Sequence, residues 1–181
     1  MTVFEAIKTM RAVRQYSEQN VPDEIVMRIL QAGRWAGSAK NVQPWKFIVV
    51  RNHDTLIRLA LCGSYASHLK EAPCAIVVVT EPTTRADFDS GRAAQNMMLA
   101  AWGEGLGSCI ASMHREAGAK NILDIPDHLK LQQVIALGYP RPNVVPTIEG
   151  KPLKDVLAST GRKPLGDIVY YERWGIADNH A

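Results

Sequence analysis

The chain has 181 residues, of which 46% are hydrophobic and 22% charged, and its formal net charge is +3. This length predicts one domain with a sizeable core. The small charge excess, without a basic run that carries interleaved aromatics, argues against a nucleic-acid-binding protein. The longest apolar run, 75–79, is too short to span a bilayer, and Glu5 and Lys8 argue against a signal peptide. The three cysteines form no CxxC pair, which indicates buried thiols in a reducing compartment. We therefore expect a cytoplasmic protein.

The first half of the chain predicts three helices and one strand. Thr2–Glu5 has the pattern of a capping box, which begins a helix that ends near Met10. Pro22 suits a first helical position, and the apolar positions that follow continue to a stop at Gly37. The sequence WKFIVV over 45–50 predicts a strand. A helix is expected over 54–61.

The second half predicts two more helices and three more strands. Residues 75–80 (AIVVVT) are apolar on both faces, which indicates a fully buried strand. The helical segment 87–104 is apolar almost all round, which predicts burial on every side. The other expected elements are a strand over 106–111, a helix over 117–123 and a strand over 131–137.

The C-terminal part has a different character. Residues 139–166 hold five of the ten prolines and show little periodicity. Such a long irregular segment has a function inside a compact domain or is disordered. It ends in Ile168-Val169-Tyr170-Tyr171 and Trp174, which we expect to be buried against another surface. Helices that alternate with strands predict an α/β or α+β layered domain, whose strand order the sequence does not reveal.

A polar loop joins the helix that ends near Gly37 to the strand that begins at Trp45. It contains Ser38, Lys40, Asn41 and Gln43. A carboxamide offers donors and an acceptor together, which suits a planar heterocycle with N–H and C=O side by side, such as a flavin pyrimidine. The alternative is an ordinary polar turn in which Pro44 begins the strand.

Two pairs of cations are candidates for an anion site. Arg11 and Arg14 follow the first helix, and Arg162 and Lys163 end the irregular arm. Guanidinium groups bind phosphate and carboxylate through two parallel N–H bonds. The alternative for the first pair is a favourable interaction with the carbonyl end of the helix.

Motifs for other chemistry are absent from the sequence. The five histidines lack metal-ligand spacing, and GEGLG over 103–107 lies between a helix and a strand, the wrong order for a dinucleotide loop. No Ser-His-Asp set is recognisable, and Cys109 in an apolar strand has the character of a structural thiol. An enzyme without an acid, base, nucleophile or metal usually relies on a cofactor.

The chain resembles the FMN-dependent nitroreductase family from Phe4 to Trp174. The similarity rests on six segments in the order of the family: 11–16 (RAVRQY), 38–45 (SAKNVQPW), 91–101 (GRAAQNMMLAA), 106–109 (LGSC), 136–140 (ALGYP) and 162–165 (RKPL). The resemblance implies an α+β fold, a three-layer α/β/α sandwich around a mostly antiparallel sheet. It also implies a homodimer with two FMN sites at the interface. Within a single domain over 1–181, residues 139–174 would be an arm that wraps the partner subunit.

The resemblance also implies roles for particular residues. Arg11 would bind the FMN phosphate or ribityl chain, and Arg14 would stabilise the anionic reduced flavin as an electrostatic partner. The other implied cofactor-binding residues are Ala12, Val13, Ser38, Asn41, Gln43, Ser108, Cys109, Arg162 and Lys163. Ser38, Asn41 and Gln43 would come from the other subunit. Ala12 replaces the family's usual Ser, and Gly37 stands where Pro is common, which predicts a looser loop.

The implied activity is a ping-pong oxidoreductase that takes hydride from NAD(P)H on FMN and reduces a small electron-poor acceptor, a nitroaromatic or a quinone. Alternatives within the family are dehalogenation, dehydrogenation and flavin processing. From other classes, two alternatives stay open: a flavin carrier or sensor without turnover, and an anion- or nucleic-acid-binding protein that uses the four cations. The physiological acceptor, the choice between NADH and NADPH, one- against two-electron chemistry, and the presence of a lid cannot be determined from the sequence.

Overall fold

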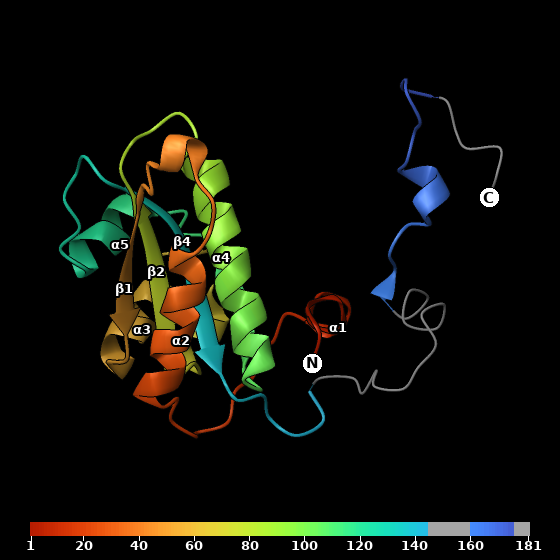
Figure 1. The fold of residues 1–181 in the computed structure, drawn as a ribbon. Helices are drawn as coiled ribbons and strands as arrows, with labels where there is room; N and C mark the ends of the chain where they lie inside the picture. Colours follow the sequence, from red (N-terminus) through yellow and green to blue (C-terminus); the bar gives the residue numbers. More distant parts are fainter. Residues whose placement is uncertain (145–159, 176–181) are drawn as a thin grey trace. The chain divides into compact units, whose positions relative to one another are not determined.

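The computed structural model describes residues 1–144 and 160–175, which belong to two units, Met1–Val145 and Pro146–Ala181. The first unit contains the predicted helices and strands, and their bounds agree to within one residue except that the second helix ends at Arg34 (Figure 1). These elements are α1 (Val3–Thr9), α2 (Asp23–Arg34), β1 (Trp45–Val50), α3 (His53–Ala60), β2 (Cys74–Thr80), α4 (Ala86–Gly103), β3 (Gly107–Ala111), α5 (Glu116–Ile122) and β4 (Lys130–Gly138). Short 3-10 turns at Ala39–Asn41 and Ser67–Lys70 were not predicted.

The four strands form an antiparallel sheet in the order β1-β2-β4-β3. At one end of the sheet Trp45 pairs with Thr80, and at the other end Cys74 pairs with Leu137. All seven residues of β2 are buried, because this central strand is covered on both faces. The prediction of a fully buried strand is confirmed.

Helices cover both faces of the sheet, which gives the predicted three-layer sandwich (Figure 1). Apolar side chains of α3 and α5 pack with alternate strand residues such as Val77 and Val134 on one face. On the other face α2 and α4 pack with Ile76 and Ile135. The alternation follows from the two-residue period of a strand, which points successive side chains to opposite faces.

Helix α4 is less enclosed than its composition predicts. Its side toward the sheet and α2 is buried through residues such as Ala93 and Met97. Its other side is open, with Phe88 60% exposed and both Arg92 and Gln95 exposed. The prediction of burial on every side is therefore wrong for the first unit by itself, because no helix or strand of residues 1–144 covers that side.

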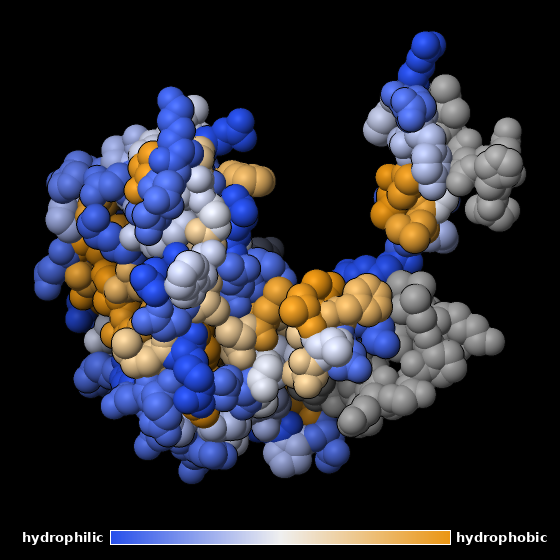
Figure 2. Space-filling view, in the orientation of Figure 1, coloured by the Kyte–Doolittle hydropathy of each residue, from blue (hydrophilic) through white to orange (hydrophobic). Residues whose placement is uncertain are grey.

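Helix α1 begins with the predicted capping box. The Thr2 hydroxyl accepts from the Glu5 main-chain N–H at 3.2 Å, and the Glu5 carboxylate accepts from the Thr2 N–H at 2.7 Å. The helix lies beside the end of α4, where Trp102 Nε1 donates to Thr9 Oγ1 at 2.8 Å. Its outer apolar side chains, including Val3 and Phe4, are more than half exposed. Figure 2 shows apolar surface over this helix.

The second unit is described over residues 160–175. It contains one 3-10 turn, Leu165–Asp167, and the rings of Tyr170 and Trp174 lie with centroids 4.5 Å apart. Ile168 is 56% exposed and Trp174 88% exposed. These exposures describe the second unit by itself, and the burial of its apolar residues against another surface stays a prediction.

Candidate functional site

The segment 11–16 pairs with strand β3 and with the chain just after β4 through two isolated bridges. Ala12 forms a parallel bridge with Ser108, and Tyr16 forms an antiparallel bridge with Pro140. The main-chain N–H of Val13 donates to the Ser108 carbonyl at 2.9 Å. The segment comes this close because Gly107 has no side chain: a Cβ there would lie 2.5 Å from Cβ of Val13.

This arrangement brings together two groups of predicted cofactor-binding residues that are far apart in the sequence. Arg11, Ala12, Val13 and Arg14 lie beside Ser108 and Cys109 on β3. Their proximity makes one cationic edge on the chain, which is called the arginine edge below.

Buried Tyr16 anchors the end of this segment. Its hydroxyl donates to the Val13 carbonyl at 2.6 Å, and the N–H of Ser17 donates to the Tyr139 carbonyl at 2.8 Å. Burial raises the pKa of Tyr16 far above its usual value, so the phenol keeps its proton and stays a donor. The main chain around Arg14 is therefore bonded on both sides.

Arg14 lies beside a buried thiol and a buried imidazole. Burial raises the pKa of the Cys109 thiol, although the guanidinium of Arg14 acts in the opposite direction. The thiol is therefore protonated at neutral pH, which agrees with a structural role. Burial and then the charge of Arg14 lower the pKa of His68. Backbone groups of Tyr65 and Cys109 lie near this ring, but neither ring nitrogen has a well-formed hydrogen bond in the described structure.

Arg11 turns back toward helix α1. Its Nη1 donates to the carbonyls of Lys8 at 2.8 Å and Met10 at 2.7 Å. A cation at this end interacts favourably with the carbonyl end of the helix. One nitrogen of Arg11 thus makes the interaction with the carbonyl end of the helix that the sequence offered as an alternative. The role of Arg11 in binding a phosphate stays a prediction.

The loop of Ser38, Asn41 and Gln43, called the amide loop below, is held from inside. The Ser38 hydroxyl accepts from the Gln43 N–H at 2.9 Å, and Gln43 Nε2 donates to the Asn41 carbonyl at 3.3 Å. Lys40, Asn41 and Gln43 all have positive φ, between 50° and 56°. Asn41 and Gln43 are exposed, so the amide groups remain open to a ligand.

Two side chains of helix α4, Asp89 and Arg92, contact the amide loop and the residue before it. The carboxylate of Asp89, which is 2% exposed, accepts from the Ala39 N–H at 3.1 Å. The guanidinium of Arg92 lies against Gly37, where a Cβ would approach Nη2 to 2.6 Å. A side chain at Gly37 would thus displace Arg92. These contacts hold the loop at a position where the sequence predicts looseness.

The arginine edge and the amide loop lie at opposite corners of the same chain. The loop leads into Trp45, which pairs with Thr80, whereas Ser108 lies level with Leu137 and Cys74. The corners are separated by the length of β2, about 20 Å, and by three strand spacings, about 14 Å. A single chain therefore does not bring these two ligand sets to one pocket.

Arg162 and Lys163 are exposed and belong to the second unit. Their part in a phosphate site with Arg11 and Arg14 stays a prediction.

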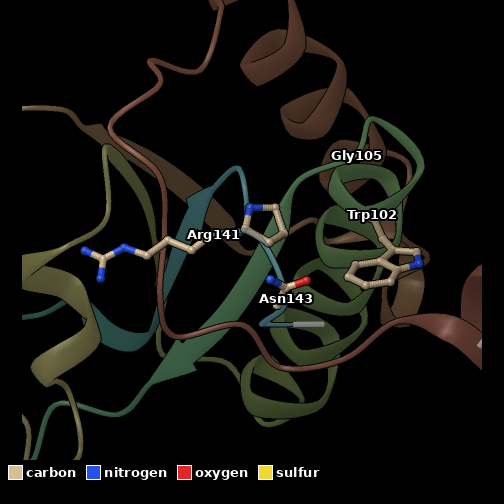
Figure 3. Close-up of a pocket in the computed structure, with 5 residues that line it drawn as sticks. Trp102, Gly105, Arg141 and Asn143 are labelled. Atoms are coloured by element: carbon tan, nitrogen blue, oxygen red, sulfur yellow. The ribbon is translucent and has the colours of Figure 1, made fainter. Parts of the chain in front are cut away.

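A hollow of about 340 Å³ lies between the end of α4 and the chain that follows β4. It is lined by Trp102, Gly105, Pro140, Arg141 and Asn143 (Figure 3). Trp102 and Asn143 are directed toward each other, whereas the guanidinium of Arg141 points away from Trp102. The hollow is therefore not an anion site built on Arg141.

Sequence reasoning missed several residues that support the two corners. Asp89, His68 and Arg141 lie within predicted elements or loops without a motif of their own. Only Asp89 carried a signal in the sequence, because it is a charged residue within the helical segment 87–104, which is apolar almost all round. The contacts of His68 and Arg141 arise only when distant segments meet.

Other site classes find no support in the described residues. No group of three or more His, Cys, Asp or Glu side chains among them could hold a metal ion. No helix over 1–144 or 160–175 is long and apolar enough to cross a membrane. The three cysteines are free and buried.

Comparison with known proteins agrees with the geometry. The sequence profile of the nitroreductase family matches residues 7–62 and 59–139. A protein of Methanothermobacter thermautotrophicus, with the provisional name NADH dehydrogenase/NAD(P)H nitroreductase, is 38% identical over 152 residues, which cover 79% of this chain and 80% of the relative.

Two solved structures share the fold. A structure from Parabacteroides distasonis with the same provisional name superposes with a TM-score of 0.83 at 27% identity and covers 95% of this chain and 98% of the other. An FMN-dependent nitroreductase of Clostridium difficile has a TM-score of 0.74 at 27% identity and covers 83% of this chain and 95% of the other.

Proposed function

The chain belongs to the nitroreductase family, and we propose that it is an FMN-dependent oxidoreductase that uses NAD(P)H to reduce electron-poor acceptors such as nitroaromatics or quinones. The observation that carries the proposal is the composition of the two corners. One offers cations beside strand β3, and the other offers exposed carboxamides and a hydroxyl. Together these groups match a phosphorylated flavin.

The donor set fits FMN group by group. Guanidinium groups suit the phosphate and an anionic ring edge, because both are negatively charged. The amides of Asn41 and Gln43 can donate to and accept from a pyrimidine edge. Gly107 lets the main chain of Val13 lie directly against β3, which leaves the exposed Arg14 at the surface of this corner.

A homodimer would join the two corners. A two-fold axis makes the same contact twice, so the arginine edge of one subunit and the amide loop of its partner would form two equivalent sites. Exposed apolar residues on α1 and on the C-terminal segment, among them Phe4 and Trp174, supply surface for such an assembly. Strand β1 lies at the end of the sheet order, and the segment 11–16 covers part of the other edge. Because the C-terminal segment carries such apolar residues, the arm over 139–174 is proposed to lie on the partner.

The protein's own residues would act by binding and electrostatics. FMN, when bound, supplies hydride acceptance from a nicotinamide and hydride delivery to an acceptor, in two half-reactions of a ping-pong cycle. Arg14 would hold a positive charge where negative charge develops, which favours reduction. The protonated thiol of Cys109 would add no opposing charge beside it.

Purification and cofactor titration test the proposal. We expect a yellow protein, or one that takes up added FMN in a defined ratio, and steady oxidation of NADH or NADPH when a quinone or nitroaromatic is supplied. A colourless protein that does not bind added FMN would contradict it. Flavin binding without nicotinamide oxidation would favour the carrier or sensor.

A further inference from the structure

Arg141 links three separate segments at the arginine edge. Its main-chain N–H donates to the Gln15 carbonyl at 3.2 Å, and its Nε donates to the Tyr16 carbonyl at 2.9 Å. Its Nη2 forms an ion pair with the Glu71 carboxylate at 3.2 Å. One side chain thus joins the chain after β4, the segment next to Arg14 and the turn before β2.

The planar fork of arginine explains why this residue type is suited to the position. Nε and Nη2 lie in one rigid plane, so a bond to Tyr16 and a bond to Glu71 fix the orientation of the whole group. A lysine ammonium is a single point and cannot reproduce both contacts in the same geometry. The guanidinium points away from the neighbouring hollow (Figure 3), and its contacts with Tyr16 and Glu71 lie at the surface, where both charged side chains are about half exposed.

The bonded carbonyls lie directly beside Arg14. Val13 and Ser17 are held through their N–H groups. The Gln15 carbonyl accepts from the main-chain N–H of Arg141, and the Tyr16 carbonyl accepts from its side chain. Arg14 itself is exposed, and its side chain lies beside Cys109. Its position therefore depends on the main chain that carries it. Small displacements of a charged group at a reacting centre have large effects on rate.

We propose that Arg141 is a positioning residue, whose side chain acts through the main-chain carbonyl of Tyr16 to hold the charge of Arg14 in place for the flavin. The proposal rests on the proposed function for its consequence, but the positioning itself is a property of the protein without cofactor. Arg141 would not touch the cofactor or the substrate.

The central experiment compares Arg141→Met with Arg28→Met. Arg28 is a matched control, because it also forms two hydrogen bonds to a glutamate, Glu104, at 2.7 and 3.0 Å, and these bonds join α2 to the end of α4 and not to the segment 11–16. In the cofactor-free protein we expect the amides of Val13 and Ser17 to exchange hydrogen about tenfold faster in Arg141→Met and unchanged in Arg28→Met.

The loaded protein provides a second measurement. In Arg141→Met we expect FMN to bind about tenfold more weakly. We also expect the midpoint potential of the FMN that stays bound to become more negative, because a displaced Arg14 charge stabilises the anionic reduced form less. A purely structural role would lower the melting temperature without changing that potential. Arg141→Lys is expected to recover part of the melting temperature through Glu71 but not the potential.

The outcomes separate the two proposals. Unchanged amide exchange at Val13 and Ser17 in Arg141→Met, or equal effects in the two methionine variants, would overturn the positioning role even if the wild type binds FMN. If the wild-type protein binds no FMN but the amides of Val13 and Ser17 exchange faster in Arg141→Met, the positioning role is retained and the proposed function is rejected. If Arg141→Met does not fold, Arg141→Lys and Glu71→Gln provide the same comparison.

Discussion

The main-chain nitrogen of Val13 lies 2.9 Å from the carbonyl oxygen of Ser108 and donates a hydrogen bond to it. This bond connects residues 95 positions apart and places Arg14 next to Cys109 on strand β3. The cationic edge of the proposed site thus depends on the pairing of the segment 11–16 with β3.

Replacement of Arg14 by alanine should weaken FMN binding by roughly tenfold to a hundredfold, because charged hydrogen bonds contribute about 1.5–3 kcal/mol. Flavin reduction by NAD(P)H should also slow. Fluorescence titration and rapid-mixing spectroscopy measure the two effects. Arg58→Ala, on the exposed side of α3, is the control, and equal behaviour of the two variants would show that Arg14 is misplaced in the proposal.

Two variants that each bind FMN weakly should complement each other if the site is shared between subunits. In a mixed dimer of Arg14→Ala and Asn41→Ala chains, one site carries both substitutions and the other carries none. With random pairing, about a quarter of all sites should regain wild-type FMN affinity. Co-expression with two tags and separation of the mixed dimer test this. A mixed dimer without a high-affinity site would indicate that the two corners do not meet across the interface.

Substitution of Gly107 by alanine should push the segment 11–16 away from β3. The new Cβ would lie 2.5–2.7 Å from the side chain of Val13, and overpacking of this kind costs about 1–3 kcal/mol. We expect a lower melting temperature and weaker FMN binding. Gly103→Ala, where nothing lies within 4 Å of the new Cβ, should be neutral or stabilising. A neutral Gly107→Ala would contradict the close approach.

His68 should make the fold less stable in acid. Its pKa in the folded chain lies below the usual value of 6.5, so between these two values the unfolded chain binds a proton that the folded chain does not. The free energy of unfolding therefore falls as the pH drops below about 6.5. Melting temperatures of the wild type and of His68→Phe between pH 8 and 5 measure the contribution, and the variant should show the weaker pH dependence. Identical slopes would mean that His68 is not responsible.

Local patterns in the sequence predicted the helices and strands of the first unit. Thr2 and Glu5 define the start of α1 through contacts three residues apart, and the unbroken apolar run of β2 indicates a strand covered on both faces. Such signals depend on neighbouring residues, so they can be recognised without knowledge of the tertiary structure. The same holds for the residue types that suit a flavin, which the sequence displays in two separate loops.

The tertiary structure decided where those residues lie. It placed Arg14 and Cys109 side by side, put the amide loop at the opposite corner, and revealed Asp89, His68 and Arg141 as supports. These contacts join segments that are 41 to 125 positions apart, and their geometry follows from strand order and from the space left by Gly37 and Gly107. Long-range packing determines both, and no local pattern encodes it.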